Sequence, residues 1–226
     1  MNGRKRRLDQ LMRKNAKAVL FDLDGTLTNT LADIAAAMNR ALAAQGLPLW
    51  ETDDYRYLVG NGARTLAQRA VRERADLLEP VLASYQQYYE THNRVRTRPY
   101  PGIPELLQAL TDRQIPCCVL SNKPHADTLE VVHFFFPDIP FAVIQGQTER
   151  WPLKPAPDAA LHIAETLHLP PADFMYLGDT AVDMTCACRA GMRPVGVLWG
   201  FRTEKELTEN GADLLLSAPM DLLNYL

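Results

Sequence analysis

Short apolar segments alternate with helical stretches along most of the chain, and this alternation limits the fold more than any other feature. Each apolar segment has the length and composition of one buried strand, and the intervening stretches show the spacing of amphipathic helices. Strands are expected at residues 18–24, 115–120, 141–144, 174–177, 194–198 and 212–216, and helices near 104–113, 124–134, 157–167, 181–190 and 203–210. This alternation predicts an α/β fold, a doubly wound parallel sheet whose connections are right-handed crossovers.

Residues 30–96 interrupt this alternation, because they contain no convincing strand and their apolar residues recur at helical spacing. The stretch leaves the α/β core directly after the first predicted strand and its loop. It returns at residues 98–102, Arg-Pro-Tyr-Pro-Gly, a rigid and turn-rich segment that suits a hinge. We therefore expect an all-helical cap over residues 30–96, inserted into an α/β core that is formed by residues 17–29 and 97–226.

Charge is spread unevenly over the 226 residues, whose net charge is -3. Residues 1–17 carry seven Lys or Arg against one Asp, so we expect residues 1–16 to form a basic extension that is disordered or helical. A short basic run is weak evidence for nucleic-acid binding, and we expect no nucleic-acid partner. No apolar run approaches the roughly 20 residues that cross a bilayer, and the basic start is not followed by the apolar stretch of a signal peptide. The sequence therefore predicts a cytoplasmic protein with no membrane partner.

Four cysteines are present. Cys117 and Cys118 are adjacent, and Cys186 and Cys188 are separated by one residue. This spacing suits neither a disulfide framework nor the C-x-x-C pairs that bind structural zinc. We expect reduced thiols, most of them buried.

Polar residues gather where three of the predicted strands end. Asp22 and Asp24 follow the first strand, Ser121-Asn122-Lys123 the second, and Gly178-Asp179-Thr180 the fourth. Parallel α/β sheets bind ligands beyond the carboxyl ends of their strands. The three groups are therefore expected to face one shared pocket.

The first group pairs two acids. Carboxylates at positions i and i+2 would point to opposite sides of a continuing strand, but a loop that turns at Gly25 can bring Asp22 and Asp24 toward one ligand. One acid can then attack while the other manages a proton. A phosphate ester is surrounded by negative charge, so a carboxylate nucleophile needs a divalent cation and positive donors beside it.

The sequence supplies the remaining parts of such a site. Asp179, with Asp183 one helical turn on, offers the hard oxygen ligands that Mg²⁺ prefers. Lys154 offers a neutralising charge, and Ser121 and the backbone amides after Gly25 offer hydrogen bonds to phosphoryl oxygens. These residues predict a magnesium-dependent reaction at a phosphate ester.

Together, these segments resemble the haloacid dehalogenase superfamily, and within it the phosphoglycolate phosphatases and their near relatives. The resemblance spans the chain from about Val19 to Val197, and its four motifs follow the family's order. Any one motif arises often by chance, whereas four in order, each at the end of a predicted strand, do not. The matching segments are Asp22-Leu23-Asp24-Gly25-Thr26-Leu27, Ser121-Asn122-Lys123, Lys154-Pro155-Ala156-Pro157, and Gly178-Asp179-Thr180 with Asp183.

The resemblance implies a role for each acid. Asp22 would be the nucleophile and a magnesium ligand, and Asp24 the general acid and base, which also gives the metal a backbone oxygen. Asp179 would ligate Mg²⁺ directly, and Asp183 would help through water or from behind the ligands. Asp183 has a second explanation, because an acid in the first turn of a helix is also favoured by the helix dipole.

The remaining motif residues would bind the phosphoryl group. The resemblance implies that the Ser121 hydroxyl and the amide of Asn122 hold this group, and that Lys154 stabilises both the nucleophile and the transferring phosphoryl. Gly25 and Thr26, in the loop after the nucleophile, are also expected to bind substrate.

The predicted cap holds the segment Val-Gly-Asn-Gly-Ala-Arg at residues 59–64, a glycine-flanked turn that lets backbone approach a ligand closely. It resembles the cap loop of phosphoglycolate phosphatases, in which that turn faces the active site. The resemblance implies that Asn61 and Arg64 bind substrate, with Arg64 holding a carboxylate through a bidentate contact. The alternative is an Asn-Gly turn followed by a solvated arginine.

The leading interpretation is hydrolysis of a small phosphate monoester, phosphoglycolate or a similar metabolite, through an aspartyl phosphate on Asp22. A phosphomutase or a pyrophosphatase of the same fold would use the same residues and stays an alternative. A non-hydrolytic phospho-acceptor module is the alternative from a different class, but such a module has no reason to carry a helical insertion beside its acid. The sequence names neither the ester nor an oligomeric state.

Overall fold

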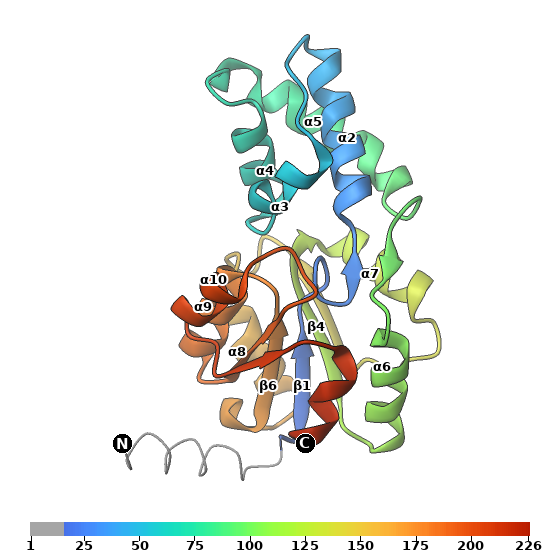
Figure 1. The fold of residues 1–226 in the computed structure, drawn as a ribbon, viewed down its shortest axis with the longest axis vertical. Coiled ribbons are helices and arrows are strands. Elements are labelled where there is room, and N and C mark those ends of the chain that lie inside the picture. Colours follow the sequence, from blue (N-terminus) through green and yellow to red (C-terminus); the bar gives the residue numbers. More distant parts are fainter. Residues whose placement is uncertain (1–15) are drawn as a thin grey trace.

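A parallel sheet forms the base of the molecule (Figure 1). The computed structural model describes residues 16–226, so the basic extension predicted for residues 1–16 lies almost entirely outside the described residues. The sheet has six strands in the order β5-β4-β1-β6-β7-β8. Their bounds are β1 (Ala18–Phe21), β4 (Cys117–Pro124), β5 (Val143–Gln147), β6 (Phe174–Gly178), β7 (Arg193–Val197) and β8 (Leu214–Leu216). The predicted α/β fold is confirmed.

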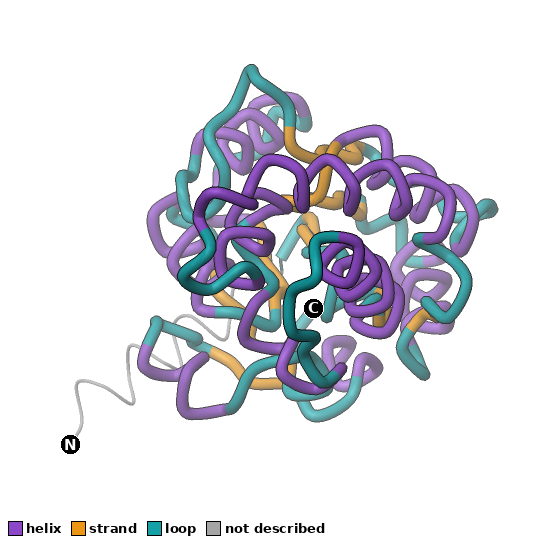
Figure 2. Tube along the Cα trace, turned by 90° about the horizontal axis from the view of Figure 1, so that it is seen from above, coloured by secondary structure: helices purple, strands orange, loops and turns teal. Residues whose placement is uncertain are grey.

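Helices cover both faces of this sheet. They are α6 (Ile103–Asp112), α7 (His125–Phe135), α8 (Asp158–Thr166), α9 (Ala181–Ala190) and α10 (Glu204–Glu209). Residues of α6 and α7 share one hydrophobic cluster with the sheet, and residues of α8 and α9 share another. Seen from above, helices surround the strands (Figure 2). The sheet is therefore doubly wound, as the sequence predicted. Within residues 16–226, no helix combines the length and apolar character that crossing a membrane requires.

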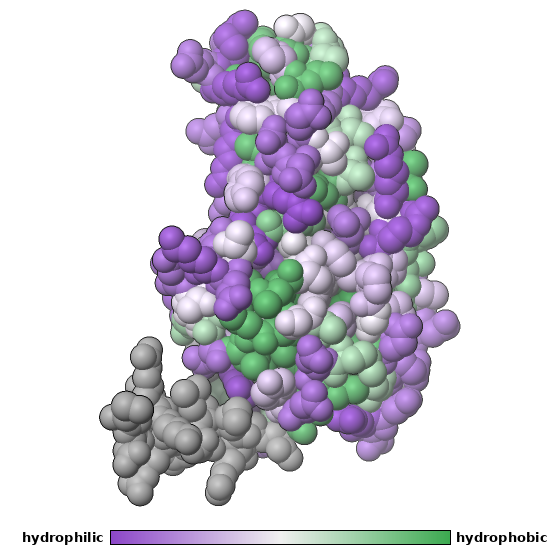
Figure 3. All heavy atoms as spheres, viewed as in Figure 1, coloured by the Kyte–Doolittle hydropathy of each residue, from purple (hydrophilic) through white to green (hydrophobic). Residues whose placement is uncertain are grey.

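The helices of the cap stand above the carboxyl ends of the strands (Figure 1). They are α2 (Leu31–Ala44), α3 (Tyr55–Leu58), α4 (Gly62–Ala70) and α5 (Leu78–His92), with 3-10 turns at Thr52–Asp54 and Ala75–Leu77. Their apolar faces form a hydrophobic cluster of their own, to which the core adds Phe201. Hydrophilic side chains cover much of the cap on the face drawn in Figure 3. Residues 30–96 contain helix and no strand, whereas the domain boundaries at these positions stay a prediction.

The two segments that join cap and core lie side by side. β2 (Thr28–Asn29) pairs antiparallel with β3 (Arg98–Pro99). A carboxylate oxygen of Asp33, in the first turn of α2, accepts hydrogen bonds of 2.8 Å from the amide and from the hydroxyl of Thr97. The sequence predicted a hinge here but not this strand pair, because strands of two residues are too short to show a period.

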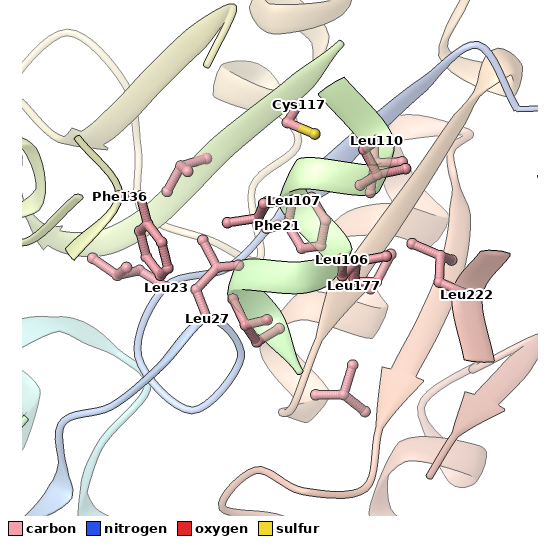
Figure 4. Packing of buried hydrophobic residues seen from close by; sticks show 14 of the residues in the cluster. Phe21, Leu23, Leu27, Leu106, Leu107, Leu110, Cys117, Phe136, Leu177 and Leu222 are labelled. Carbon is pink, nitrogen blue, oxygen red and sulfur yellow. The ribbon is translucent and has the colours of Figure 1, made fainter. Parts of the chain in front are cut away.

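β1 is buried on both faces, as expected for the central strand of a parallel sheet. Val19 and Phe21 belong to one hydrophobic cluster, and Ala18 and Leu20 to the other. This period of two places a core on each side of the sheet. Figure 4 shows the cluster around Phe21, in which Leu107 of α6 lies beside the ring.

All six strands of the sheet differ from their predicted limits by at least one residue, and two of them extend well beyond their apolar runs. β4 runs on to Pro124, so Ser121-Asn122-Lys123 forms the end of the strand and not the loop after it. β5 covers Val143–Gln147, later than the apolar residues 141–144 indicated. Its polar half pairs with β4 across an irregular register. Both strands extend beyond their apolar residues because the polar residues that follow pair through their backbones. A sequence indicates a strand mainly by its apolar residues, so these extensions were not predicted.

The thiols agree with the expectation from their spacing. Cys117, Cys118 and Cys186 are buried, Cys188 is exposed, and none of the four, all within the described chain, forms a disulfide.

Candidate active site

A cavity lies between the carboxyl ends of the strands and the cap. Its empty volume, which includes open solvent at its mouth, is about 690 Å³. The core lines it with Asp22, Asp24, Ser121 and Lys154 among others, and α2, α4 and α5 line it from the cap. β1, β4 and β6 are neighbours in the sheet, so their carboxyl ends bring together residues that are far apart in the sequence. The shared pocket predicted from the strand ends is therefore present.

Asp22 directly follows β1 and lies at the floor of the cavity. Its Oδ1 accepts a hydrogen bond of 2.7 Å from the Leu23 amide and lies 2.8 Å from Nζ of Lys154. Burial raises the pKa of Asp22 to about 7, a rise that Asp183 strengthens and Lys154 opposes. A cation bound beside this carboxylate would favour its ionised form.

Asp22, Asp179 and Asp183 form a buried cluster in which each offers one carboxylate oxygen within 4.8 Å of the others. Asp179 follows β6, and its Oδ2 accepts a hydrogen bond of 2.8 Å from the Phe201 amide. Its Oδ1 is buried and has no hydrogen-bond partner within residues 16–226. Burial, with the charges of Asp183 and Asp22, raises the pKa of Asp179 well above its usual value. An unpaired buried carboxylate oxygen is costly, and a hard divalent cation would satisfy it.

Asp183 directs its carboxylate mainly to protein groups. Oδ1 lies 2.7 Å from Nζ of Lys154, and Oδ2 accepts hydrogen bonds from the amide and the hydroxyl of Thr180 at 3.1 and 2.6 Å. The acid thus holds the first turn of α9 and also orients Lys154. Both explanations offered for Asp183, a first-turn acid and a support for the site, agree with this geometry.

Lys154 lies between the two carboxylates of Asp22 and Asp183, and its Nζ also donates to the carbonyl of Leu120 at 3.0 Å. Burial alone would lower the pKa of Lys154, but the two carboxylates outweigh it and the pKa is raised. The ammonium therefore stays charged and brings fixed positive charge to the floor of the cavity.

Gly25 allows the acids to pack this closely. Its φ is +89°, and a Cβ on it would overlap the carboxylate of Asp179. The amides of Gly25 and Thr26 bond within their own loop, to the carbonyls of Thr28 and Leu23 at 2.8 and 3.3 Å. The expectation that these two residues bind substrate is therefore not supported, because their amides are occupied. Thr26 is fully buried beneath the site, which also keeps its side chain from the cavity.

Ser121 and Asn122, at the end of β4, have different roles. Ser121 lines the cavity, and its hydroxyl accepts a hydrogen bond of 3.2 Å from the Lys123 amide. The side-chain amide of Asn122 donates to the carbonyls of Gly60 and Lys154 at 3.0 and 3.1 Å, and its oxygen accepts from the Lys154 amide at 2.9 Å. Both amide hydrogens of Asn122 are used, so its side chain ties the cap to the core. The expected contact between the backbone amide of Asn122 and a phosphoryl group stays a prediction.

Lys123 is a site residue whose role was not predicted from the sequence. Its Nζ lies 2.9 and 2.7 Å from the two carboxylate oxygens of Asp24 and 2.9 Å from the hydroxyl of Tyr89 on α5. Its side chain is buried, and Asp24 is held at the cavity wall by this contact. The signal was present, because Lys123 belongs to the same strand end as Ser121.

Comparison with known proteins agrees with this chemistry. Residues 19–197 match a family model that describes haloacid dehalogenase-like hydrolases. The chain belongs to this family. The match includes all four motifs, and it confirms the resemblance that the sequence indicated.

Several relatives of this haloacid dehalogenase-like hydrolase are named as phosphatases. A phosphoglycolate phosphatase from Aquifex aeolicus is 30% identical over 210 residues, which cover 93% of this chain and 96% of the relative. An N-acetylmuramic acid 6-phosphate phosphatase from Pseudomonas aeruginosa is 31% identical over an alignment of 231 positions, which covers 96% of this chain and 97% of the relative. The crystal structure of a predicted phosphoglycolate phosphatase from Haemophilus somnus superposes with a TM-score of 0.87 at 28% identity, over 93% of this chain and 98% of that one. The expected class of enzyme, a phosphoric monoester hydrolase, is confirmed by these relatives.

The cap loop of this haloacid dehalogenase-like hydrolase differs from its expectation in one respect. Backbone atoms at Gly60 and Gly62 do line the cavity. Arg64, however, points to the surface, where its guanidinium pairs with both carboxylate oxygens of Glu79 at 2.7 and 2.9 Å. The side chain of Asn61 accepts a hydrogen bond from an arginine of α4 at 2.8 Å. Neither residue lines the cavity. The ion pair of Arg64 agrees with the solvated-arginine alternative and does not favour the expected contact with a substrate carboxylate.

Proposed function

We propose that this chain is a magnesium-dependent phosphatase that hydrolyses a small phosphate monoester through an aspartyl phosphate on Asp22. The observation that carries the proposal is the buried cluster of Asp22, Asp179 and Asp183, with Lys154 between two of the acids. Asp22 and Lys154 also line the cavity. Few other reactions need a carboxylate nucleophile, a divalent cation and a fixed ammonium at one point.

The residues present fit a divalent cation, because the free Oδ1 of Asp179 and the carboxylate of Asp22 are hard oxygen donors. We infer that these two carboxylates and the backbone oxygen of Asp24 hold Mg²⁺. When bound, the ion would neutralise charge on the nucleophile and on the phosphoryl group.

The reaction of the chain's own groups follows from their positions. The carboxylate of Asp22 would attack phosphorus, and the bond from phosphorus to the alcohol oxygen would break as Asp24 gives that oxygen its proton. Asp24 would then take a proton from water, which attacks the same phosphorus and releases Asp22 and phosphate. Lys154 would offset charge on Asp22 and the phosphoryl group, and Lys123 would keep Asp24 aimed into the cavity.

A small phosphorylated metabolite is the partner that this proposal implies. Phosphoglycolate is the first ester to test because relatives carry that activity in their names. A phosphomutase, a pyrophosphatase and a phospho-acceptor module would use the same acids.

The unpaired thiols favour a reducing compartment, and we propose that the protein is located in the cytoplasm.

The test is phosphate release with Mg²⁺ from p-nitrophenyl phosphate, phosphoglycolate, hexose phosphates, nucleotides and pyrophosphate. Asp22→Asn should abolish release, whereas Asp138→Asn, the same change at an exposed position, should leave it unchanged. If neither wild type nor variant releases phosphate while acetyl phosphate still labels Asp22, the phospho-acceptor or mutase alternative replaces hydrolysis.

A further inference from the structure

Two lysines line the cavity within residues 16–226, and each is already paired with carboxylates. Lys154 lies between Asp22 and Asp183, with Nζ to oxygen distances of 2.8 and 2.7 Å. Lys123 has both carboxylate oxygens of Asp24 within 2.9 Å of its Nζ. A substrate with a second anionic group would find no uncompensated cation in the described part of this cavity.

The cap side of the cavity has no charged residue among those described. Aliphatic and aromatic side chains such as Ile34, Leu66 and Tyr85 form it, together with the turn at residues 60–63. The arginine expected to serve a substrate carboxylate, Arg64, is held in an exposed ion pair outside the cavity. Hydrophilic side chains cover much of the outer surface of the cap on the face drawn in Figure 3.

Asp127 and Gln86 line the same space, and no hydrogen bond joins either side chain to another residue of the described chain. Asp127, in the first turn of α7, is partly buried, and Gln86 of α5 is exposed at the rim. Burial raises the pKa of Asp127, a rise that Lys123 opposes and that Glu130 and Asp24 strengthen. A second anion beside Asp127 and Asp24 would be repelled, whereas a hydroxyl group could donate to Asp127 and bond with the amide of Gln86.

We propose that the alcohol part of the substrate is uncharged and carries hydroxyl groups, as in the monophosphates of polyols and sugars. Its hydroxyls would bond with Asp127 and Gln86, and its carbon face would pack on Tyr85 and Tyr89, whose stacked rings have centroids 5.2 Å apart. A carboxylate in that place would lose its water without gaining a cation, which is unfavourable. The inference rests on the proposed function and narrows its substrate, and it places phosphoglycolate among the disfavoured esters.

The test compares pairs of phosphate esters in which one member has a CH₂OH group where the other has a carboxylate. Glycerol 3-phosphate pairs with 3-phosphoglycerate, and glucitol 6-phosphate pairs with 6-phosphogluconate. Dissociation constants are measured by calorimetry with Mg²⁺ on Asp22→Asn, which does not turn the esters over. We expect the neutral member of at least one pair to bind about tenfold or more tighter than its carboxylate partner, a difference of about 1.4 kcal/mol. Equal or tighter binding of the carboxylates, or no binding of either neutral ester, would overturn the inference.

A charge added at the rim supplies a second, independent readout. Gln86→Lys, made in the same background, should strengthen binding of the carboxylate esters several-fold and leave the neutral esters nearly unchanged. Gln87→Lys is the matched control, because it adds the same charge one residue further along α5 at an exposed position that does not line the cavity. If both lysines act alike, the effect is one of net charge and the assignment of the cavity wall fails.

Failure of the proposed function gives a different result. Turnover of p-nitrophenyl phosphate by the wild type tests the phosphatase, whereas the ratio of dissociation constants tests the substrate class. No turnover of p-nitrophenyl phosphate, together with the expected ratio of dissociation constants, would contradict the proposed hydrolysis alone. Normal turnover with tighter binding of the carboxylate esters would contradict only the proposal that the alcohol part of the substrate is uncharged.

Discussion

Residue 25 must be glycine for two separate reasons, which substitutions can distinguish. Its φ of +89° lies in the left-handed region, and a Cβ there would overlap the carboxylate of Asp179. Gly46 shares the first constraint but not the second, because its φ is +66° and no atom of the described chain lies within 4 Å of a Cβ built on it. Gly46→Ala should therefore lower the free energy of unfolding by about 1–2 kcal/mol and leave activity unchanged.

Gly25→Ala adds displacement of Asp179 to the same backbone strain. We expect a larger loss of unfolding free energy and a fall in kcat of about a hundredfold, since a misplaced group in a catalytic site is costly. Urea unfolding and hydrolysis of p-nitrophenyl phosphate measure the two effects. Equal behaviour of the two alanine variants would mean that the contact with Asp179 is unimportant.

The cysteines should differ in reactivity by position. Burial raises the pKa of Cys117, Cys118 and Cys186 to about 12, so that their thiols stay protonated as well as inaccessible. Cys188 is exposed. Iodoacetamide near neutral pH should add one group to the folded protein, at Cys188, and modify all four cysteines after unfolding in guanidinium, as peptide mass spectrometry will show. Rapid modification of Cys118 in the folded protein would contradict this packing.

At the scale of single residues, the sequence indicated which side chains lie close together in the site. It did not indicate which partners their hydrogen bonds have. Asp22 and Lys154 were expected together, and they form an ion pair of 2.8 Å. The side-chain amide of Asn122 donates hydrogen bonds to the carbonyls of Gly60 and Lys154. The guanidinium of Arg64 forms an ion pair with an acid of α5. These partners lie 15 or more residues away along the chain, so no local pattern reveals them.

One helix of the cap touches the machinery of the core directly. Tyr89 of α5 brings its hydroxyl to Nζ of Lys123, which in turn holds Asp24. Tyr89→Phe removes this hydroxyl alone and keeps the ring in the cap cluster. We expect kcat to fall by about tenfold, with KM nearly unchanged. A hydrogen bond to a charged group is worth about 1.5–3 kcal/mol, and the effect should lie at the lower end of that range because Lys123 keeps its ion pair.

Tyr88→Phe is the control for that change, since Tyr88 is the preceding residue of α5 and stacks on His92 instead. It should leave both kinetic constants as they are. A similar loss in both variants would place the effect in the helix and not in the contact with Lys123.

Elements with their own periodicity were predicted well, and elements that depend on a partner were not. α9 covers Ala181–Ala190, the range that its spacing indicated. β2 and β3 pair over two residues each and have no pattern to detect. The polar end of β5 is a strand because β4 offers it backbone partners. Pairing of this kind is a tertiary effect, which local propensity does not contain.

Across the whole molecule, the buried acids between sheet and cap oppose folding until a cation joins them. The proposed Mg²⁺ site exists only in the folded chain, so binding there should stabilise the fold by about 2.7 kcal/mol at a concentration of about 100 times its Kd. For a chain of this size we expect Tm to rise by several degrees. Differential scanning calorimetry with and without MgCl₂, against NaCl at equal ionic strength, measures the shift.

Asp179→Asn separates this stabilisation from general salt effects. The variant removes one buried negative charge while its amide oxygen can still accept from the Phe201 amide. We expect a higher Tm than wild type without Mg²⁺, little further rise with it, and no activity. An unchanged response to Mg²⁺ would show that the ion binds elsewhere.

The pairing of β2 with β3 means that the chain leaves the core and returns to it at almost the same point. The closure entropy of an insertion between fixed neighbouring ends grows only slowly with its length. The segment between these strands can therefore be lengthened, shortened or exchanged with little effect on the sheet that carries the nucleophile. Descendants of such a chain can acquire new specificities by replacing one module while the catalytic floor stays as it is.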